Sequence, residues 1–375
     1  MKKLIVPLLF VLAGTCFVTY SFLDTFIIPK KYAPIANSNS SSRSFSFLEM
    51  GDESSTSSSS ANNNNNSQSS NSSSSSSVEA AVNDGTYYEN LTKEQISALF
   101  TQEKVFEISE TRKRYSDPDI YVDITTDRFE DAGNYYVADI RLRSFRYFKT
   151  ALAQDTAGEN YKEKTSSMCI RHKGIIAIDG DTYGSQKSGY VIRNGTTIRT
   201  TKNTSRKKPE DLAIYPNGTF EIFNENDYTF DQIASKGPLH VFSFGPGLVD
   251  KGQKIIQKGE EVGTAAGGNR NQRCAIGMIA PLHYAFVVSD GRITESPGLS
   301  LYQMGKIMQE RLHCYTAYNL DGGGSATMYF DDGTGGTAGA LINVCTQENT
   351  GGFRPSANPK IEEREISDIV YIGKE

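Results

Sequence analysis

The most informative stretch of this chain is Asn319-Leu320-Asp321-Gly322-Gly323-Gly324-Ser325-Ala326-Thr327-Met328. It ends an apolar run with one carboxylate and continues with three glycines and a hydroxyl. Glycine permits positive φ and lets backbone N–H groups approach a ligand closely. Successive N–H groups of this kind form a nest for anionic oxygen. We therefore predict a site for a sugar, a phosphate or a metal, with Asp321 at its rim and Ser325 donating from the far side; a simple tight turn between strands is the alternative.

Two better-known catalytic turns are excluded at this position. The residue two places after Ser325 is Thr327, so the second glycine of a Gly-x-Ser-x-Gly nucleophile elbow is missing. No Gly-Lys-Ser or Gly-Lys-Thr follows the glycines, so the turn is not a phosphate-binding P-loop.

A second carboxylate motif, Asp179-Gly180-Asp181-Thr182-Tyr183-Gly184, follows the apolar run at 175–178. Two carboxylates at a strand end can hold a cation or divide acid and base roles. An EF-hand is excluded because Tyr183 occupies the third ligand position and Tyr190 occupies the place of the bidentate glutamate. A looser site for Ca²⁺ or Mg²⁺ at Asp179 and Asp181 stays open, as does a turn whose aspartates accept backbone N–H groups.

One arginine, Arg273, precedes a small apolar strand at 274–277. Its planar guanidinium suits a phosphate or carboxylate group bidentately, and a surface ion pair is the alternative. The strand-to-loop junction at 243–249 is expected to shape the site without reacting. The four histidines have no metal-ligand spacing. No basic block is interleaved with aromatic residues, so we expect no nucleic-acid partner.

The N-terminal fifth of the 375-residue chain differs from the rest in composition. Met1-Lys2-Lys3 precedes an apolar stretch from Leu4 to about Leu23, and about 20 apolar residues suffice to cross a bilayer. We predict an uncleaved signal anchor over 1–29, with a cleaved signal peptide as the alternative. A disordered tether rich in serine and asparagine follows at 30–85. The expected product is a single-pass cell-membrane protein with an extracellular C-terminal domain, or a secreted protein if the segment is cleaved.

The remaining residues indicate an α+β fold, a strand-rich mixed sheet with few helices. Residues 86–103 form a short helical lead-in, and 104–375 form one globular head. Hairpins are predicted at Asn194-Gly195 and Asn217-Gly218. In the later half, one clear helix begins after Ser300 with a Ser-x-x-Gln capping box. Four cysteines lie in the head, in no zinc spacing, and either two disulfides or four free thiols fit them: Cys169, Cys274, Cys314 and Cys345.

Taken in order, these pieces resemble the phosphodiester glycosidase family. The segments that carry the resemblance are 165–166, 177–184, 243–249, 273–277, 319–328 and the closing strand 365–373. The Asn-Leu-Asp-Gly-Gly-Gly-Ser block is highly specific, and together the segments span about residues 104–375. The chain departs from the family at Asp179, where Asn-Gly is usual, which leaves the role of that carboxylate open.

The resemblance implies an extracytoplasmic hydrolase that cleaves a sugar-1-phosphodiester of a surface glycan or glycoconjugate. In ordinary glycosidases a carboxylate pair stabilises the oxocarbenium-like transition state, and the expected catalytic residues are Asp181, Asp321 and Asp179. The groups expected to bind substrate or phosphate are Arg273, Gly322, Gly323, Gly324, Ser325, Asn319 and Tyr183. A non-catalytic module that binds cell-wall polymer or exopolysaccharide, and a transferase acting on the same polymer, are the alternatives.

Overall fold

The computed structural model describes Thr19 and residues 30–31, 93–206, 208–258, 270–334, 340–347 and 360–375. The expected signal anchor and the serine- and asparagine-rich tether lie outside these ranges, apart from Thr19 and residues 30–31. No helix within the described ranges is long and apolar enough to cross a membrane.

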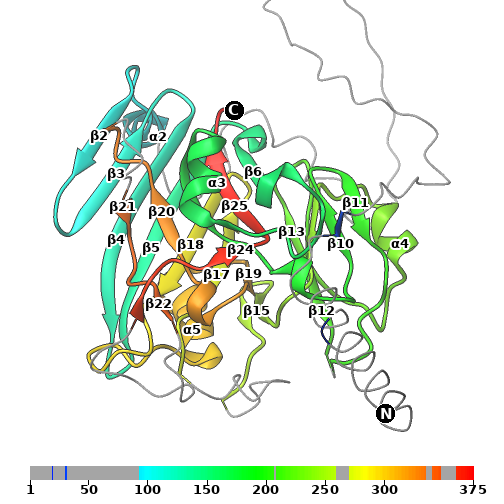
Figure 1. Ribbon diagram of the computed structural model, residues 1–375. Helices are drawn as coiled ribbons and strands as arrows, with labels where there is room; N and C mark the ends of the chain where they lie inside the picture. The colour runs from blue at the N-terminus through cyan, green and yellow to red at the C-terminus, as the bar shows by residue number, and fades with distance from the viewer. Residues whose placement is uncertain are drawn as a thin grey trace, which may run out of the picture. The chain divides into compact units, whose positions relative to one another are not determined.

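Three antiparallel sheets build the head (Figure 1). The first has nine strands in the order β16-β15-β19-β17-β18-β5-β4-β3-β2: β2 (Val105–Ile108), β3 (Arg112–Ser116), β4 (Ile120–Phe129), β5 (Gly133–Leu142), β15 (Gly247–Asp250), β16 (Gln253–Lys254), β17 (Cys274–Ala280), β18 (His283–Ser289) and β19 (Thr316–Asn319). The second has the order β21-β20-β9-β25-β6: β6 (Phe148–Leu152), β9 (Gly174–Asp179), β20 (Met328–Phe330), β21 (Ala340–Leu341) and β25 (Asp368–Gly373). The third has the order β11-β10-β14-β12-β13: β10 (Val191–Arg193), β11 (Thr196–Arg199), β12 (Glu210–Ile214), β13 (Phe220–Asn224) and β14 (His240–Phe242).

Three two-stranded pairs complete the strands: β1 (Lys30–Lys31) with β7 (Gly158–Glu159), β8 (Glu163–Lys164) with β24 (Glu365–Ile366), and β22 (Thr346–Gln347) with β23 (Lys360–Ile361). The helices are α2 (Lys93–Leu99), α3 (Thr165–Arg171), α4 (Phe230–Ala234) and α5 (Leu301–Lys306), which continues as the π-helical turn η5 (Ile307–Arg311). Single 3₁₀ turns are η2 (Phe145–Tyr147), η3 (Ala153–Asp155), η4 (Tyr183–Ser185) and η6 (Gly323–Ser325).

Side-chain alternation along the strands explains why one core holds all three sheets together. Successive residues of a strand point to opposite faces. In β17, Cys274 and Ile276 therefore enter the shared core, whereas Ala275 faces outward toward a second apolar cluster. The same division holds in β9 around Ala177 and in β12 around Ala213. Short continuous apolar runs thus mark strands that are buried on both faces.

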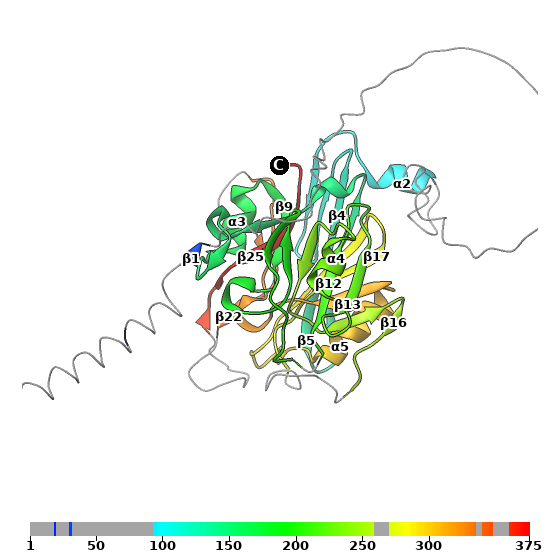
Figure 2. The ribbon, with the colours of Figure 1, turned by 90° about the vertical axis from the view of Figure 1, so that its right-hand side faces the viewer.

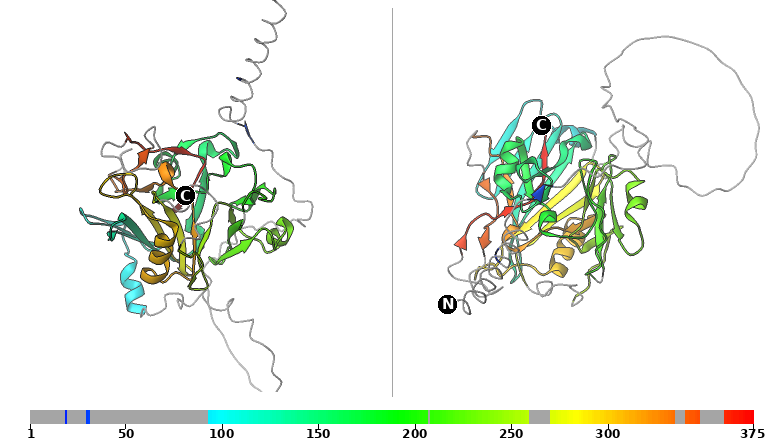
Figure 3. Two further views of the ribbon diagram at one scale, coloured as in Figure 1. Left: turned by 90° about the horizontal axis from the view of Figure 1, so that it is seen from below. Right: turned by 45° about the vertical axis from the view of Figure 1, so that its right-hand side comes forward.

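Each sheet has its outer face covered by one helix (Figure 2). Met304 of α5 packs on the first sheet, Met168 of α3 on the second, and Ile233 of α4 on the third. Figure 3 shows the third sheet, in green, beside the yellow and orange strands of the first. The predicted capping box at the start of α5 is present: the Ser300 hydroxyl accepts from the Gln303 N–H, and the Gln303 side chain accepts from the Ser300 N–H.

The loops that cross between sheets position the functional residues. Loop 180–190 leads from β9 to β10, loop 243–246 from β14 to β15, and loop 320–327 from β19 to β20. Each loop therefore joins a different pair of the three sheets. Three of the sequence motifs, at 177–184, 243–249 and 319–328, contain these crossovers.

The structure confirms the strand-rich α+β class, both predicted hairpins and the α5 start. Every strand pair in the described ranges is antiparallel, so the expected mixed sheet is not seen there. The prediction of a single clear helix after the first half missed α4, a five-residue helix whose capping box begins at Thr229. The four cysteines of the head are all free and buried.

Candidate functional site

The three crossover loops meet at one point through hydrogen bonds. The N–H of Asp321 donates to the carbonyl oxygen of Gly180 over 3.0 Å. The N–H of Ser243 donates to Oδ2 of Asp181 over 2.8 Å, and Nδ2 of Asn319 donates to the carbonyl oxygen of Gly245 over 2.8 Å. Segments far apart in the sequence thus form one site where the sheets join.

Asp321 is the carboxylate of this junction that is partly exposed. Its Oδ1 accepts a hydrogen bond from the N–H of Gly322 over 2.8 Å. Its Oδ2 accepts a short hydrogen bond from the hydroxyl of Thr182. Both oxygens are therefore oriented, while the side chain stays open to solvent.

Thr182 holds an unfavourable backbone conformation to make this bond. Its φ and ψ are 58° and 32°, in the left-handed region. A β-branched residue with positive φ is a genuine outlier and costs on the order of 1–3 kcal/mol. The turn is fixed by the Ser185 N–H, which donates to the Thr182 carbonyl, and by Nε2 of Gln186, which donates to the Asp181 carbonyl. Strain at this position coincides with the exposed carboxylate.

Two guanidinium groups lie directly against the triple-glycine turn. A Cβ placed on Gly323, whose φ is +60°, would lie 2.6 Å from Nη2 of Arg292. A Cβ placed on Gly324 would lie 2.6 Å from Nη2 of Arg364. The positive φ favours glycine at Gly323, and a Cβ at either position would push an arginine side chain away from the turn. Arg292 is buried and Arg364 is exposed, so positive charge faces the turn from the interior and from solvent.

The glycine amides form a smaller nest than the sequence predicted. The N–H of Gly322 is used by the carboxylate of Asp321, and the N–H of Gly323 donates to the carbonyl oxygen of Gln272 over 3.0 Å. Ser325 is buried, and its N–H donates to the carbonyl oxygen of Gly322. For the N–H of the buried Gly324, the described part of the chain shows no such hydrogen bond.

Asp179 lies behind Asp321 and is fully buried. Its Oδ1 accepts from the N–H of Thr327 over 3.0 Å, and its Oδ2 has no hydrogen-bond partner in the described part of the chain. Burial and the neighbouring charge of Asp321 raise the pKa of the Asp179 carboxyl well above its usual value. A fully buried carboxyl and a partly exposed one are thus neighbours in this site.

Asp181 is also fully buried, but it is ion-paired. Its Oδ1 lies 2.6 Å from Nη2 of Arg193, and the same guanidinium lies 2.9 Å from Oδ2 of Asp368. Burial and the charge of Asp181 raise the pKa of Asp368 to about 6. With Ser243 donating to its other oxygen, the Asp181 carboxylate joins the three sheets and does not face solvent.

The residues do not fit the divalent cation left open by the sequence. The Asp181 oxygens both accept from N–H donors, which a cation would have to displace. The Asp179 carboxyl accepts from Thr327, a residue that makes no hydrogen bond to Asp181 in the described part of the chain. The raised pKa of Asp179 also favours its neutral form. Within the described ranges, no group of three or more His, Cys, Asp or Glu side chains is placed to hold a metal ion.

The other sequence-predicted residues shape the site from behind. Arg273 is buried, and its Nε donates to the carbonyl oxygen of Leu299 over 3.0 Å. Asn319 ties the end of β19 to the loop 243–246, as described above. Tyr183 is fully buried, and its hydroxyl oxygen accepts from the N–H of Gly158. These contacts hold strands and loops together.

Sequence reasoning missed the residues that complete the site, namely Thr182, Arg292, Arg364, Arg193 and Asp368. Thr182 stood inside a quoted motif, and its place between an aspartate and a tyrosine gave no sign of its conformation. Arg292 follows Asp290 and Gly291 just after β18, so its strand-to-loop position was a usable signal. Arg364 and Arg193 carry no local pattern, since only the tertiary fold brings them to the junction.

Comparison with solved structures gives matches at low identity. The catalytic domain of zebrafish N-acetylglucosamine-1-phosphodiester alpha-N-acetylglucosaminidase, auto-inhibited by its pro-peptide, is 19% identical with a TM-score of 0.48, over 73% of this chain and 87% of that one. A hypothetical protein from Synechocystis is 13% identical with a TM-score of 0.46, over 70% and 64%. A putative exported protein from Burkholderia pseudomallei is 14% identical with a TM-score of 0.39, over 64% and 74%.

No curated protein matches the chain. A family model does: the phosphodiester glycosidase model covers residues 172–372, more than half of the 375 residues and all three crossover loops. The chain therefore belongs to the phosphodiester glycosidase family.

Proposed function

We propose that the protein hydrolyses a sugar-1-phosphodiester of a surface glycan or glycoconjugate, with Asp321 acting at the anomeric carbon. One observation carries this proposal: a partly exposed carboxylate, oriented by Thr182 and Gly322, sits in a turn faced by two guanidinium groups. A carboxylate beside two guanidinium groups suits a substrate in which the anomeric carbon of a sugar is joined to a phosphate.

Arg292 and Arg364 are assigned to the phosphate. Guanidinium groups bind phosphate oxygens through charge-assisted, often bidentate hydrogen bonds. The Gly324 N–H lies in the same turn and adds a neutral donor. These donors stabilise the negative charge that collects on the departing phosphate, as preorganised donors do in other hydrolases. Arg273, assigned to the phosphate from the sequence, instead supports the start of β17 through Leu299.

Asp321 is assigned as the general base. A phosphomonoester is a good leaving group, so a carboxylic acid that protonates it is not required. Asp179 and Asp181 are fully buried, which makes Asp321 the carboxylate of the junction able to reach a bound water. Water oxygen bonds to the anomeric carbon as the bond to phosphate oxygen breaks, one water proton passes to Asp321, and the phosphomonoester leaves with the electron pair. Direct attack by water inverts the anomeric centre.

We further propose that the head is attached to the membrane through the predicted anchor and acts outside the cytoplasm. The support is the lysine-flanked apolar stretch from Leu4 to about Leu23 and the serine- and asparagine-rich tether after it. Protease treatment of intact cells tests this location: loss of the head while a cytoplasmic marker survives agrees with it, and protection of the head contradicts it.

The experiment for the reaction uses the purified full chain and synthetic sugar-1-phosphodiesters of both anomeric configurations. Proton NMR follows the anomeric signal, and phosphorus NMR follows the new phosphomonoester. The proposal expects both products in equal amounts, with the sugar first appearing in the inverted configuration. Retention of configuration would show that Asp321 acts as a nucleophile and not as a general base. Transfer of the sugar to an added polymer, without release of free sugar, would show that the protein is a transferase and not a hydrolase.

A further inference from the structure

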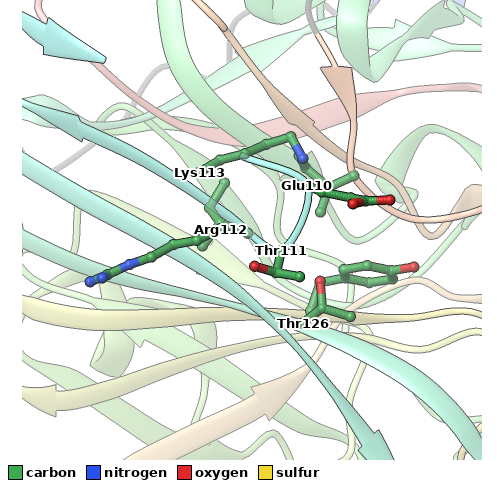
Figure 4. A pocket seen from close by; sticks show the side chains of 8 residues that line it. Glu110, Thr111, Arg112, Lys113 and Thr126 are labelled. Carbon is green, nitrogen blue, oxygen red and sulfur yellow. The ribbon is translucent and has the colours of Figure 1, made fainter. Parts of the chain in front are cut away.

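A pocket of about 270 Å³ lies apart from the glycine turn, at the outer end of the nine-stranded sheet. Its walls are the turn between β2 and β3 and the neighbouring residues of β3, β4 and β5. The lining residues are Glu110, Thr111, Arg112, Lys113, Ile124, Thr126, Tyr136 and Ile342. Figure 4 shows Lys113 reaching toward Glu110, whereas Arg112 points away from the other labelled side chains.

Strand register places this pocket on the face of the nine-stranded sheet that packs into the shared core and ends beside Asp179. Cys274 pairs with Val288, Val288 with Tyr136, and Tyr136 with Thr126, so their side chains form one row across four strands. At the inner end, Sγ of Cys274 lies 3.9 Å from the carbonyl oxygen of Asp179. Neighbouring strands are about 4.8 Å apart, so Tyr136 lies about 10 Å from Cys274 and Thr126 about 15 Å from it.

A continuous segment also links the pocket to the glycine turn. Ile342 lines the pocket, and Gln347 donates to the carbonyl oxygen of Gly324 over 3.1 Å. Between them, the N–H of Val344 donates to Asp290, whose other oxygen accepts from the Tyr136 hydroxyl. Asp290 precedes Arg292, one of the two arginines assigned to the phosphate, by two residues. The floor of the pocket is therefore tied to the segment that carries that arginine.

The lining chemistry identifies the class of ligand. Two threonine hydroxyls, one ammonium group and one carboxylate surround an aromatic ring and two aliphatic side chains. The guanidinium of Arg112 is bound to Asp123 on the opposite face of the sheet, so the pocket itself holds one charge of each sign. A neutral, hydroxyl-rich ring suits this lining, because it offers hydrogen-bonding groups and an apolar face together. A phosphate would meet the Glu110 carboxylate.

We propose that this pocket is a second carbohydrate subsite, which takes a neutral sugar unit of an extended substrate whose phosphodiester lies at the glycine turn. The proposal rests on the proposed function, since it names the substrate of that same site as a chain rather than a single sugar phosphate. Binding at this subsite does not require hydrolysis, so the two ideas can be tested separately.

The test measures binding of cello-, chito-, manno- and malto-oligosaccharides of one to six units to the full chain by calorimetry. Thr126→Trp fills the pocket, and a strand tolerates the aromatic ring. Thr125→Trp is the matched control, because Thr125 is also exposed but points to the other face of the sheet. The proposal expects at least one series whose affinity rises with length, weakened at least about tenfold by Thr126→Trp and unchanged by Thr125→Trp.

Three results overturn the subsite: no oligosaccharide binds the unaltered chain, affinity does not depend on length, or both tryptophan variants weaken binding equally. Repeating the titration with Asp321→Asn separates the ideas. Unchanged oligosaccharide binding by this variant would show that the subsite does not depend on Asp321. Length-dependent binding by an unaltered chain that releases no sugar from any sugar-1-phosphodiester would retain the subsite and reject the proposed hydrolysis.

Discussion

Thr182 donates its hydroxyl hydrogen bond to Oδ2 of Asp321, from a residue 139 positions earlier in the chain and from a left-handed backbone conformation. The two residues belong to two different crossover loops, one leaving β9 and the other leaving β19. A strained residue that orients the only partly exposed carboxylate among Asp179, Asp181 and Asp321 is a positioning residue for that carboxylate. Its removal therefore has a specific signature.

Replacing Thr182 with valine removes the hydroxyl and keeps the shape. A hydrogen bond to a charged group is worth about 1.5–3 kcal/mol, so we expect kcat to fall about 10- to 100-fold and Tm to fall by a few degrees. Thr182→Ser keeps the hydroxyl and should retain most of the rate. Thr182→Gly also loses the hydroxyl but relieves the strain, so its Tm should lie above that of Thr182→Val while its kcat is equally low. Equal rates for the serine and valine variants would exclude the positioning role.

Asp179→Asn tests the buried carboxyl whose pKa is raised. Because the folded-state pKa of Asp179 lies above its unfolded value, this group stabilises the fold fully below the unfolded pKa of about 3.9, and the stabilisation is lost as pH rises through the folded pKa. Asparagine mimics the neutral form, so the fall in Tm between pH 5 and pH 8 should become smaller. The kcat should fall less than about tenfold; a loss as deep as that of Asp321→Asn would make Asp179 a catalytic acid.

The same stability effect should appear in Asp211→Asn, because burial and Glu225 raise the pKa of Asp211 as well. Within the described ranges, Asp211 makes no hydrogen bond to the glycine turn or to Thr182. Its variant therefore serves as the control that separates a change in the pH dependence of Tm from a change in activity.

The two turn-facing arginines are tested by Arg364→Met and Arg292→Lys. Methionine keeps the length of the exposed side chain and removes its charge, so KM for a sugar-1-phosphodiester should rise about tenfold and become less sensitive to salt. Lysine keeps the charge at the buried position but loses the planar fork, so a rise of similar size is expected. Unchanged KM in both variants would show that these two arginines do not bind the phosphate of the substrate.

Asp181→Asn separates the two aspartates that the sequence treated alike. Asp181 and Arg193 are fully buried, and breaking such a pair costs about 3–5 kcal/mol. The lower end is expected because Asp368 still pairs with the arginine. Tm should fall on the order of 10 °C. A folded chain with unchanged Tm and no activity would instead return Asp181 to the catalytic group.

The sequence was sufficient for the parts of this site that are encoded locally. Alternating apolar residues and Asn-Gly turns predicted β12 and β13, and the glycines after Asp321 predicted a ligand-facing turn. It was insufficient where tertiary contacts decide the chemistry. Asp179 and Asp181 look equivalent in sequence, but Asp179 is the last residue of β9 and Asp181 lies in the loop after it. The chain leaves the strand between them, so Asp179 contacts Thr327 and Asp181 pairs with Arg193. Arg292 is assigned to the phosphate in place of Arg273 only because the fold places the Arg292 guanidinium against Gly323.

The most direct test of the central claim is the rate at which the Asp321→Asn variant of the full chain releases sugar and phosphomonoester from a sugar-1-phosphodiester. The side chain is partly exposed, so its Tm should stay within a few degrees of the unaltered chain. The account predicts release by the unaltered chain and at least a thousandfold loss in the variant, on the order expected when a group essential to the reaction is removed. Release at an undiminished rate by the variant would contradict it.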